Sequence, residues 1–324
     1  MSQQRTPKTL QQATPKTLQQ LTPHMLKRLW QQALLIRKTE ERLLLAAESG
    51  ELMGTTHCCI GQEANAVALC SQLLEGDFVT SNHRCHGHYI ALTDDVEGLV
   101  AEVFGRSTGV MGGRGGSQHL LTPRFLSNGI LGGTAPIAAG IALSNKLAQE
   151  NSEQSDNHTA HIVVCFLGDG ALGEGIVYEA LNMCALWNLP VLFVVENNHI
   201  AQSTPIHKNL AGSIEARFEA FGIPAKQVKG FGLEQIYQVA QACIREVRQS
   251  TCARALIIDS FRFCHHSVRD ECRDLSNIEF MRAQDPLSND LQKILGSELE
   301  VILRHLDERL DLAFENARRA PLAQ

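Results

Sequence analysis

Two apolar runs separated by one helix-length segment constrain the fold of this 324-residue chain most strongly. Residues 161–167 (HIVVCFL) and 191–196 (VLFVVE) are rich in Val, Leu and Phe without polar alternation, which indicates strands buried on both faces. The segment at about 173–187 has the length and composition of a crossover helix. Strand, helix and strand form a βαβ unit, so this pattern predicts a parallel sheet with helices packed on it.

The remaining segments are consistent with one doubly wound α/β domain. Further strands are expected near 77–80, 225–228 and 255–261, and further helices at 22–48, 62–74, 132–148, 214–221, 233–247 and 291–317. The segment 105–116 is too rich in glycine for regular structure. Within residues 6–20 the heptapeptide TPKTLQQ occurs twice, which is typical of a flexible extension. We therefore predict an arm at 1–24 and a single domain at 25–324.

Composition excludes several functional classes. The formal net charge is −6 with no basic stripe, which argues against a nucleic-acid groove. No apolar run approaches the length of a membrane span, and the polar first residues lack a secretory segment, so a cytoplasmic location is expected. The ten cysteines have irregular spacings, which favours buried thiols in a reducing compartment over a zinc site.

The most specific motif follows the two central strands. Gly168-Asp169-Gly170 ends the first strand, and Asn197-Asn198 ends the second. Each dipeptide alone is an ordinary loop signal. Because the carboxyl ends of neighbouring parallel strands lie at one edge of a sheet, Asp169 and Asn198 could converge on one hard cation. Carboxylate and amide oxygens beside a diphosphate suit Mg²⁺, and the glycines would let the backbone approach the phosphates.

This arrangement resembles the thiamine-diphosphate motif. Residues 168–205 (GDGALGEGIVYEALNMCALWNLPVLFVVENNHIAQSTP) are similar to the α subunits of pyruvate, branched-chain 2-oxo acid and acetoin dehydrogenases. The resemblance extends over about residues 25–318 and implies the thiamine-diphosphate-binding fold, with thiamine diphosphate and Mg²⁺ as cofactors. It implies that Asp169 and Asn198 bind Mg²⁺ together with the carbonyl of Ile200. It also implies that Gly170 and Ala171 cradle the diphosphate.

Two further segments carry histidines that the resemblance places at the site. Residues 54–64 (GTTHCCIGQEA) resemble a family segment whose histidine lies over the substrate, here His57. Residues 83–88 (HRCHGH) resemble a turn whose first two residues bind the diphosphate, here His83 and Arg84. A guanidinium presents paired donors suited to phosphate oxygens, so Arg84 is the stronger assignment. His83 stands where many relatives have Tyr. A metal cluster of His83 with His86 and His88 is disfavoured, because no carboxylate or thiolate partner is nearby in sequence.

Two more segments complete the resemblance. Residues 128–133 (NGILGG) are similar to a family segment that touches the aminopyrimidine ring, through Gly129 and the backbone of Leu131 here. Residues 261–271 (FRFCHHSVRDE) resemble the regulated loop, and His266 matches its catalytic histidine, which contacts the diphosphate and aids acyl transfer to lipoamide. Ser267 falls at a position phosphorylated in mitochondrial relatives, although an ordinary loop serine is expected here. Cys264 departs from the family pattern.

The expected activity is oxidative decarboxylation of a pyruvate-like 2-oxo acid, with acyl transfer to a lipoyl acyltransferase. No carboxylate in this chain is a convincing activator of the aminopyrimidine, and in the resembled family a β subunit supplies it. The chain is therefore expected to be half of an α₂β₂ enzyme, inert alone. Three alternatives stay open: an acetoin dehydrogenase α subunit, a two-component thiamine-dependent acyl or acyloin transferase of secondary metabolism, and a cofactor-free interaction subunit.

Overall fold

The computed structural model describes residues 21–52, 54–150, 160–267 and 271–324. Nearly all of the predicted arm therefore lies outside the described residues. The first helix, α1 (Pro23–Glu48), begins where the sequence predicts, with Pro23 at its first position. The side chain of Thr22 caps this helix by accepting a hydrogen bond from the backbone N–H of Met25.

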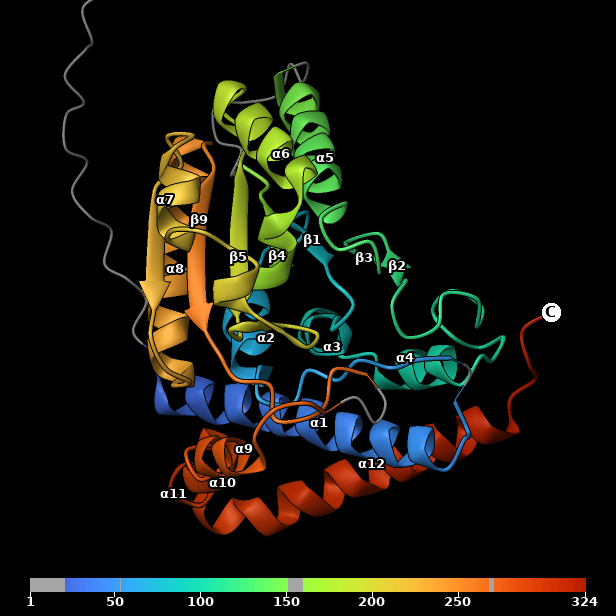
Figure 1. Cartoon of the computed structure of the whole chain (residues 1–324). Coiled ribbons are helices and arrows are strands. Elements are labelled where there is room, and N and C mark those ends of the chain that lie inside the picture. The colour runs from blue at the N-terminus through green and yellow to red at the C-terminus, as the bar shows by residue number, and fades with distance from the viewer. Residues whose placement is uncertain (1–20, 53, 151–159, 268–270) are drawn as a thin grey trace, which may run out of the picture.

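A seven-stranded sheet forms the centre of the molecule (Figure 1). Its order is β2-β3-β1-β4-β5-β9-β8, and every neighbouring pair is parallel except β2 with β3. The strands are β1 (Phe78–Ser81), β2 (Leu121–Thr122), β3 (Phe125–Ser127), β4 (Val163–Gly168), β5 (Val191–Asn197), β8 (Ala225–Val228) and β9 (Arg254–Asp259). A separate hairpin pairs β6 (Ile200–Ala201) with β7 (Thr204–Pro205). The predicted parallel sheet is confirmed.

Helices cover both faces of this sheet. One face carries α5 (Thr134–Glu150), α6 (Gly175–Leu186) and α7 (Ile214–Glu219). The other carries α2 (Glu63–Cys70), α3 (His86–Thr93) and α8 (Leu233–Ser250), and the apolar cluster on that side continues into α4 (Val96–Val103) and α1. Successive residues of the central strands alternate between the two apolar clusters, so Val163 packs on one face and Val164 on the other. This explains why the strand sequences are continuously apolar.

The chain reverses its direction of travel across the sheet between β1 and β4. From β1 it proceeds to β3 on one side, and from β4 it proceeds to β5 on the other. Adjacent parallel strands whose connections leave in opposite directions create a crevice beyond their carboxyl ends, where open sheets bind ligands. In Figure 1, α1 runs across this end of the sheet, below the strand ends. The predicted motif residues follow β1, β4 and β5.

Several sequence predictions differ from the structure. The long helix expected at 291–317 is broken: α11 (Leu291–Leu295) is followed by a 3₁₀ turn at Gly296–Glu298 and then by α12 (Leu299–Arg319). Gly296 has φ +55°, a left-handed conformation that ends α11. Residues 83–85 form a turn as predicted, but α3 already begins at His86, and neither α3 nor α4 was predicted. Two short C-terminal helices, α9 (Leu275–Arg282) and α10 (Pro286–Asn289), were also missed.

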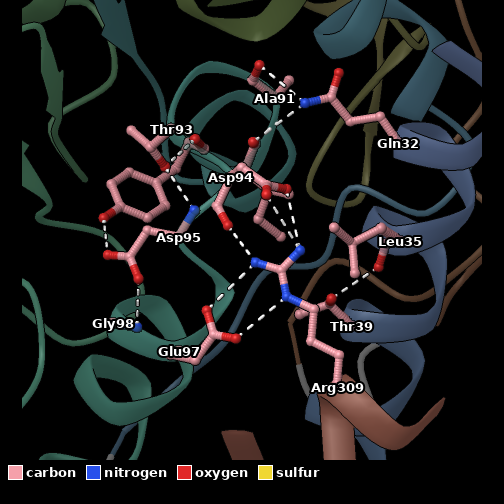
Figure 2. Close-up of polar contacts among 12 residues, drawn as sticks. Gln32, Leu35, Thr39, Ala91, Thr93, Asp94, Asp95, Glu97, Gly98 and Arg309 are labelled. Atoms are coloured by element: carbon pink, nitrogen blue, oxygen red, sulfur yellow. Dashed lines mark hydrogen bonds and ion pairs between the residues drawn. The ribbon is translucent and has the colours of Figure 1, made fainter. Parts of the chain in front are cut away.

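The C-terminal helix α12 is docked against α4 by both packing and charge. Phe104 after α4 and Phe314 of α12 meet edge to face, with ring centroids 5.7 Å apart. Arg309 donates hydrogen bonds to the carboxylates of Asp94 and Glu97 (Figure 2). This pairing joins the end of the chain to the segment that follows α3.

The glycine-rich segment is irregular, as predicted, and is organised by one buried carboxylate. Glu102 in α4 accepts four backbone N–H groups, from Met111, Gly113, Gly115 and Gly116. Glu102 is completely buried, so these donors replace its lost hydration.

None of the helices in the described part of the chain combines the length and apolar character that a membrane span requires.

Candidate active site

A cavity of about 270 Å³ lies at the carboxyl ends of β1, β4 and β5. It gathers residues from segments far apart in sequence, including the turn after β1, the loops after β4 and β5, and the loop after β9. Its lining comprises Gln62, Asn82, His83, Arg84, Leu131, Gly168, Asp169, Gly170, Ala171, Glu174, Glu196, Asn198, Ile200, Ala201, Gln202 and His266. Nine of the predicted site residues are therefore brought to one cavity, at the crevice that the sheet topology favours.

Asp169 supplies a buried carboxylate oxygen that has no partner. It begins the 3₁₀ turn that follows β4, and only 2% of its surface is exposed. Its Oδ2 atom is buried without a hydrogen bond. Burial raises the pKa of Asp169 to about 6, although nearby backbone N–H groups and His199 partly oppose this rise. An orphaned carboxylate facing a cavity suits a cation, so the residues present fit a divalent metal ion here.

The loop after β5 brings Asn198 and Ile200 to the lining of the same cavity as Asp169. Asn198 lines the cavity, and its Oδ1 accepts the N–H of Ile200 at 3.2 Å. His199 between them has φ +63°, so the backbone reverses sharply and returns as the β6–β7 hairpin. Gly170 faces this hairpin closely, because a Cβ at that position would lie 2.7 Å from the Cβ of Ala201. A glycine is thus needed for the contact.

Arg84 is buried and held by contacts with two other loops. Its Nη1 donates to the carbonyl of Cys58 at 2.7 Å, and its Nη2 lies 3.0 Å from Nδ1 of His266. Nη2 also donates to the carbonyl of His266 at 3.2 Å. The guanidinium therefore joins the loop that carries His57 to the loop that carries His266, while it lines the cavity with its positive charge.

Three imidazoles converge beside the cavity. The ring centroid of His57 lies 4.8 Å from that of His83 and 4.8 Å from that of His266, and the latter two rings are 5.4 Å apart. Both ring nitrogens of His83 are buried without a hydrogen-bond partner. Burial and the neighbouring charge of Arg84 lower the pKa of His83 far below its ordinary value, so this ring is neutral.

The other histidines of the same turn have structural partners. His86 lies between Oε2 of Glu40, at 3.0 Å, and the carbonyl of Ser117. Burial works to raise the pKa of Glu40, but the charge and hydrogen bond of His86 outweigh it and keep this pKa below its ordinary value. His88 contacts Ser81 and lies 3.5 Å from a carboxylate oxygen of Glu196. His86 and His88 therefore have partners other than His83.

Two predicted residues lie at the margin of the site. His57 is not part of the cavity lining but contacts it through the rings of His83 and His266. Gly129 also lies outside the lining, against Gln118, where a Cβ would meet Oε1 of Gln118 at 2.4 Å. Gln118 in turn reaches Nδ1 of His57 at 3.3 Å. Gly129 is therefore connected to His57 through Gln118.

Sequence reasoning missed several lining residues. Gln62 has a buried Oε1 without a partner, while its Nε2 donates to Ser260 at 3.3 Å. Glu196 is a buried carboxylate that accepts a hydrogen bond from Asn65 at 3.0 Å. Glu174 accepts the N–H of Gly132 at 3.3 Å. The carboxylate at the end of the apolar run 191–196 was a signal that could have identified Glu196.

Comparisons with known proteins agree with this geometry. The family model for the dehydrogenase E1 component matches residues 31–319. The chain is 41% identical, over 224 residues, to the α subunit of acetoin:2,6-dichlorophenolindophenol oxidoreductase from Bacillus subtilis, covering 68% of this chain and 65% of that protein. It is 34% identical to the pyruvate dehydrogenase E1 component subunit α of Rickettsia felis, covering 80% of this chain and 78% of the relative.

The pyruvate dehydrogenase E1 component subunit α of Zymomonas mobilis is also 34% identical, covering 90% of this chain and 84% of that protein. The family match spans most of the chain and includes every segment that lines the cavity. The chain therefore belongs to the dehydrogenase E1 component family, among the α subunits of thiamine-diphosphate-dependent 2-oxo acid dehydrogenases.

Proposed function

We propose that this chain binds the diphosphate end of thiamine diphosphate through Mg²⁺, in an enzyme that oxidatively decarboxylates a pyruvate-like 2-oxo acid. The observation that carries the proposal is the unpartnered Oδ2 of Asp169 in the cavity at the strand ends. A buried carboxylate without a partner costs stability, and a bound dication would remove that cost. Asn198 and the carbonyl of Ile200 are the proposed companion ligands, with Gly170 and Ala171 lining the diphosphate position.

Arg84 is the proposed counter-charge for the diphosphate. Its forked guanidinium lines the cavity, and its contacts with Cys58 and His266 fix its orientation. His83 and the backbone of Leu131 line the same cavity and are proposed as cofactor contacts. Gly129 is proposed to act from the edge, where it contacts Gln118.

The histidines are proposed to handle protons and to position the substrate. When bound, thiamine diphosphate supplies a carbon nucleophile and an electron sink for decarboxylation. His57 and His266 lie together beside the cavity and would hold the 2-oxo acid and donate or accept protons. Arg84 orients His266 through Nδ1, which directs the other ring nitrogen away from the guanidinium.

The site is proposed to be completed by a β subunit. The carboxylates in the lining are Asp169, Glu174 and Glu196. Asp169 is assigned to the metal ion, and Glu196 is engaged by Asn65 and His88. Glu174 accepts the N–H of Gly132. None of the three is therefore assigned to activate an aminopyrimidine, and we propose that a β subunit supplies that carboxylate in an α₂β₂ assembly. A lipoyl acyltransferase is the proposed acyl acceptor. An intact cavity with an orphaned Asp169 argues against a cofactor-free interaction subunit.

Acetoin is the second candidate substrate, because the Bacillus subtilis relative is the α subunit of an acetoin oxidoreductase and is 41% identical. Turnover with 2,6-dichlorophenolindophenol as the electron acceptor distinguishes the two candidates. The chain co-expressed with its β partner should reduce the dye with pyruvate or a related 2-oxo acid, and only when Mg²⁺ and thiamine diphosphate are present. Reduction with acetoin alone would select the second candidate. Reduction that does not need thiamine diphosphate would refute the proposal.

A further inference from the structure

The loop before α2 and the loop after β9 bring two free thiols together. Cys58 lies on the first loop and Cys264 on the second. Both side chains pack in one small apolar cluster with Phe263. The backbone N–H of Phe263 donates to the carbonyl of Ile60 at 3.1 Å, so the two loops run side by side near the cysteines. The proposed function uses neither thiol.

The two thiols interact directly. A hydrogen bond from Cys58 lowers the pKa of Cys264, and the same bond together with burial raises the pKa of Cys58. Arg84 fastens both loops, because it donates to the carbonyl of Cys58 at 2.7 Å and to a carbonyl of the loop after β9 at 3.2 Å. The sulfur of the neighbouring Cys59 instead lies against α3, 2.8 Å from the position that a Cβ on Gly87 would take. Cys58 and Cys264 are therefore the pair placed to form the S–S bond of a disulfide, which is about 2.05 Å long.

The surroundings give the two thiols different roles. Cys264 is partly exposed, and Arg273 donates to its backbone carbonyl at 2.7 Å. Arg282 donates to the carbonyl of the preceding residue, Phe263, at 3.2 Å. Positive charge beside a partly exposed thiol favours the thiolate, which is the nucleophile in thiol–disulfide exchange. Cys58 is only 2% exposed, so it can react only with a sulfur that is already held inside the protein.

We propose that Cys58 and Cys264 form a reversible redox-modification site, which a low-molecular-weight disulfide such as oxidised glutathione converts to a disulfide. The Cys264 thiolate attacks one glutathione sulfur, which forms a mixed disulfide and expels one glutathione thiolate. Cys58 then loses its proton and attacks the Cys264 sulfur, which expels the second glutathione thiolate. The two protein thiols thus lose two electrons and two protons, and these reduce one oxidised glutathione to two thiols.

The bond would join the loop of His57 to the loop of His266 covalently. Closing the two sulfurs to bonding distance would displace one or both proposed catalytic histidines, and small displacements at a reacting centre are costly. Oxidation should therefore lower turnover at least about tenfold, and reduction with dithiothreitol should restore it. This consequence rests on the proposed function, whereas the formation of the bond does not. Unchanged turnover after complete disulfide formation would overturn the inferred effect on catalysis.

The test is treatment of the complex with its β subunit by oxidised glutathione near neutral pH. Free thiols are then alkylated rapidly, and the peptides of this chain are analysed by mass spectrometry. The wild type should gain one disulfide per chain, between Cys58 and Cys264, with no glutathione retained on either residue. Dithiothreitol should remove this disulfide.

Two variants separate the roles of the two thiols. Cys58→Ala should stop at the mixed disulfide and retain one glutathione on Cys264, because the second thiol is missing. Cys264→Ser should leave Cys58 unmodified, because that thiol is buried. Cys272→Ser is the control: Cys272 is exposed, and its loss should leave the Cys58–Cys264 bond intact.

Three results would overturn the proposal: glutathione retained on Cys264 in the wild type, a disulfide between Cys264 and any other cysteine, or no modification of Cys264. All of these readouts are masses of peptides and need no turnover. A complex that binds no thiamine diphosphate would therefore refute the proposed function while leaving the modification site to be judged on its own.

Discussion

Replacing Asp169 by Asn should stabilise the metal-free protein while abolishing its cofactor binding. Burial raises the pKa of Asp169 from an ordinary value of 3.8 to about 6. At 1.36 kcal/mol for each pKa unit, ionising this group in the folded state costs about 3 kcal/mol at pH 7. An amide carries no charge to desolvate, although its NH₂ group would be left without a partner at a cost of about 1–3 kcal/mol. We therefore expect a net gain of up to about 2 kcal/mol.

The pH dependence isolates the electrostatic part of this gain. Because the folded pKa of Asp169 lies above its unfolded value, the folded state binds more protons between about pH 4 and pH 6. The stability of the wild type relative to Asp169→Asn therefore falls as pH rises through this window. When the pH is lowered from 7 to 4, we expect the free energy of unfolding of the wild type to rise by about 2 kcal/mol relative to that of Asp169→Asn. With about 2.1 cal/mol/K of unfolding entropy per residue, that corresponds to about 3 °C in melting temperature.

The assay is thermal unfolding of the metal-free, cofactor-free complex at matched scan rates from pH 4 to pH 7. Asp311→Asn serves as the control, because Asp311 is exposed and its surface ion pair with Arg42 contributes little. Adding Mg²⁺ and thiamine diphosphate at pH 7 should raise the melting temperature of the wild type and leave that of Asp169→Asn unchanged. A difference between variant and wild type that does not change with pH would refute the electrostatic reasoning.

The remaining predictions concern groups around the cavity. Arg84→Lys should weaken thiamine diphosphate binding by about tenfold or more, because an ammonium group cannot make the two contacts of the guanidinium, with Cys58 and His266, and still present paired donors to a diphosphate. An unchanged calorimetric Kd would contradict this prediction. Glu40→Gln should lower the free energy of unfolding measured with urea by about 3 kcal/mol, because the buried imidazole of His86 loses its charged partner. The control Glu41→Gln should leave that free energy almost unchanged, because Glu41 is exposed. Glu102→Gln should destabilise by about 2–3 kcal/mol, because one of two oxygens that accept backbone N–H groups becomes a donor. Equal stability of this variant and the wild type would show that the glycine-rich segment does not need the carboxylate.

The sheet and the motif residues could be predicted because they depend on local patterns. Strands buried on both faces produce continuous apolar runs, and the carboxyl ends of parallel neighbours must share one edge. Asp169 and Asn198 follow β4 and β5, which pair in register from Val163 with Val191 to Gly168 with Glu196. Their convergence on one cavity follows from that geometry, and the prediction of a parallel sheet is confirmed.

The features that sequence reasoning missed depend on contacts between distant segments. Residues 83–88 were predicted to form a turn, yet α3 begins at His86, whose side chain is buried against Glu40 of α1. The family resemblance placed His57, His83 and His266 at the site, but no local pattern encodes their contact, which requires the loop after β9 to fold back over the turn after β1. The break at Gly296 was overlooked because the flanking residues continue an amphipathic helical pattern. The roles assigned to individual site residues stay predictions.

The most direct test of the central claim is calorimetric titration of thiamine diphosphate with Mg²⁺. Three samples are compared: this chain alone, the chain with its β partner, and the partnered Asp169→Ala variant. We expect tight, Mg²⁺-dependent binding only to the wild-type pair. Equally tight binding to the Asp169→Ala pair would contradict the assignment of the metal site, and tight binding to the chain alone would contradict the shared active site.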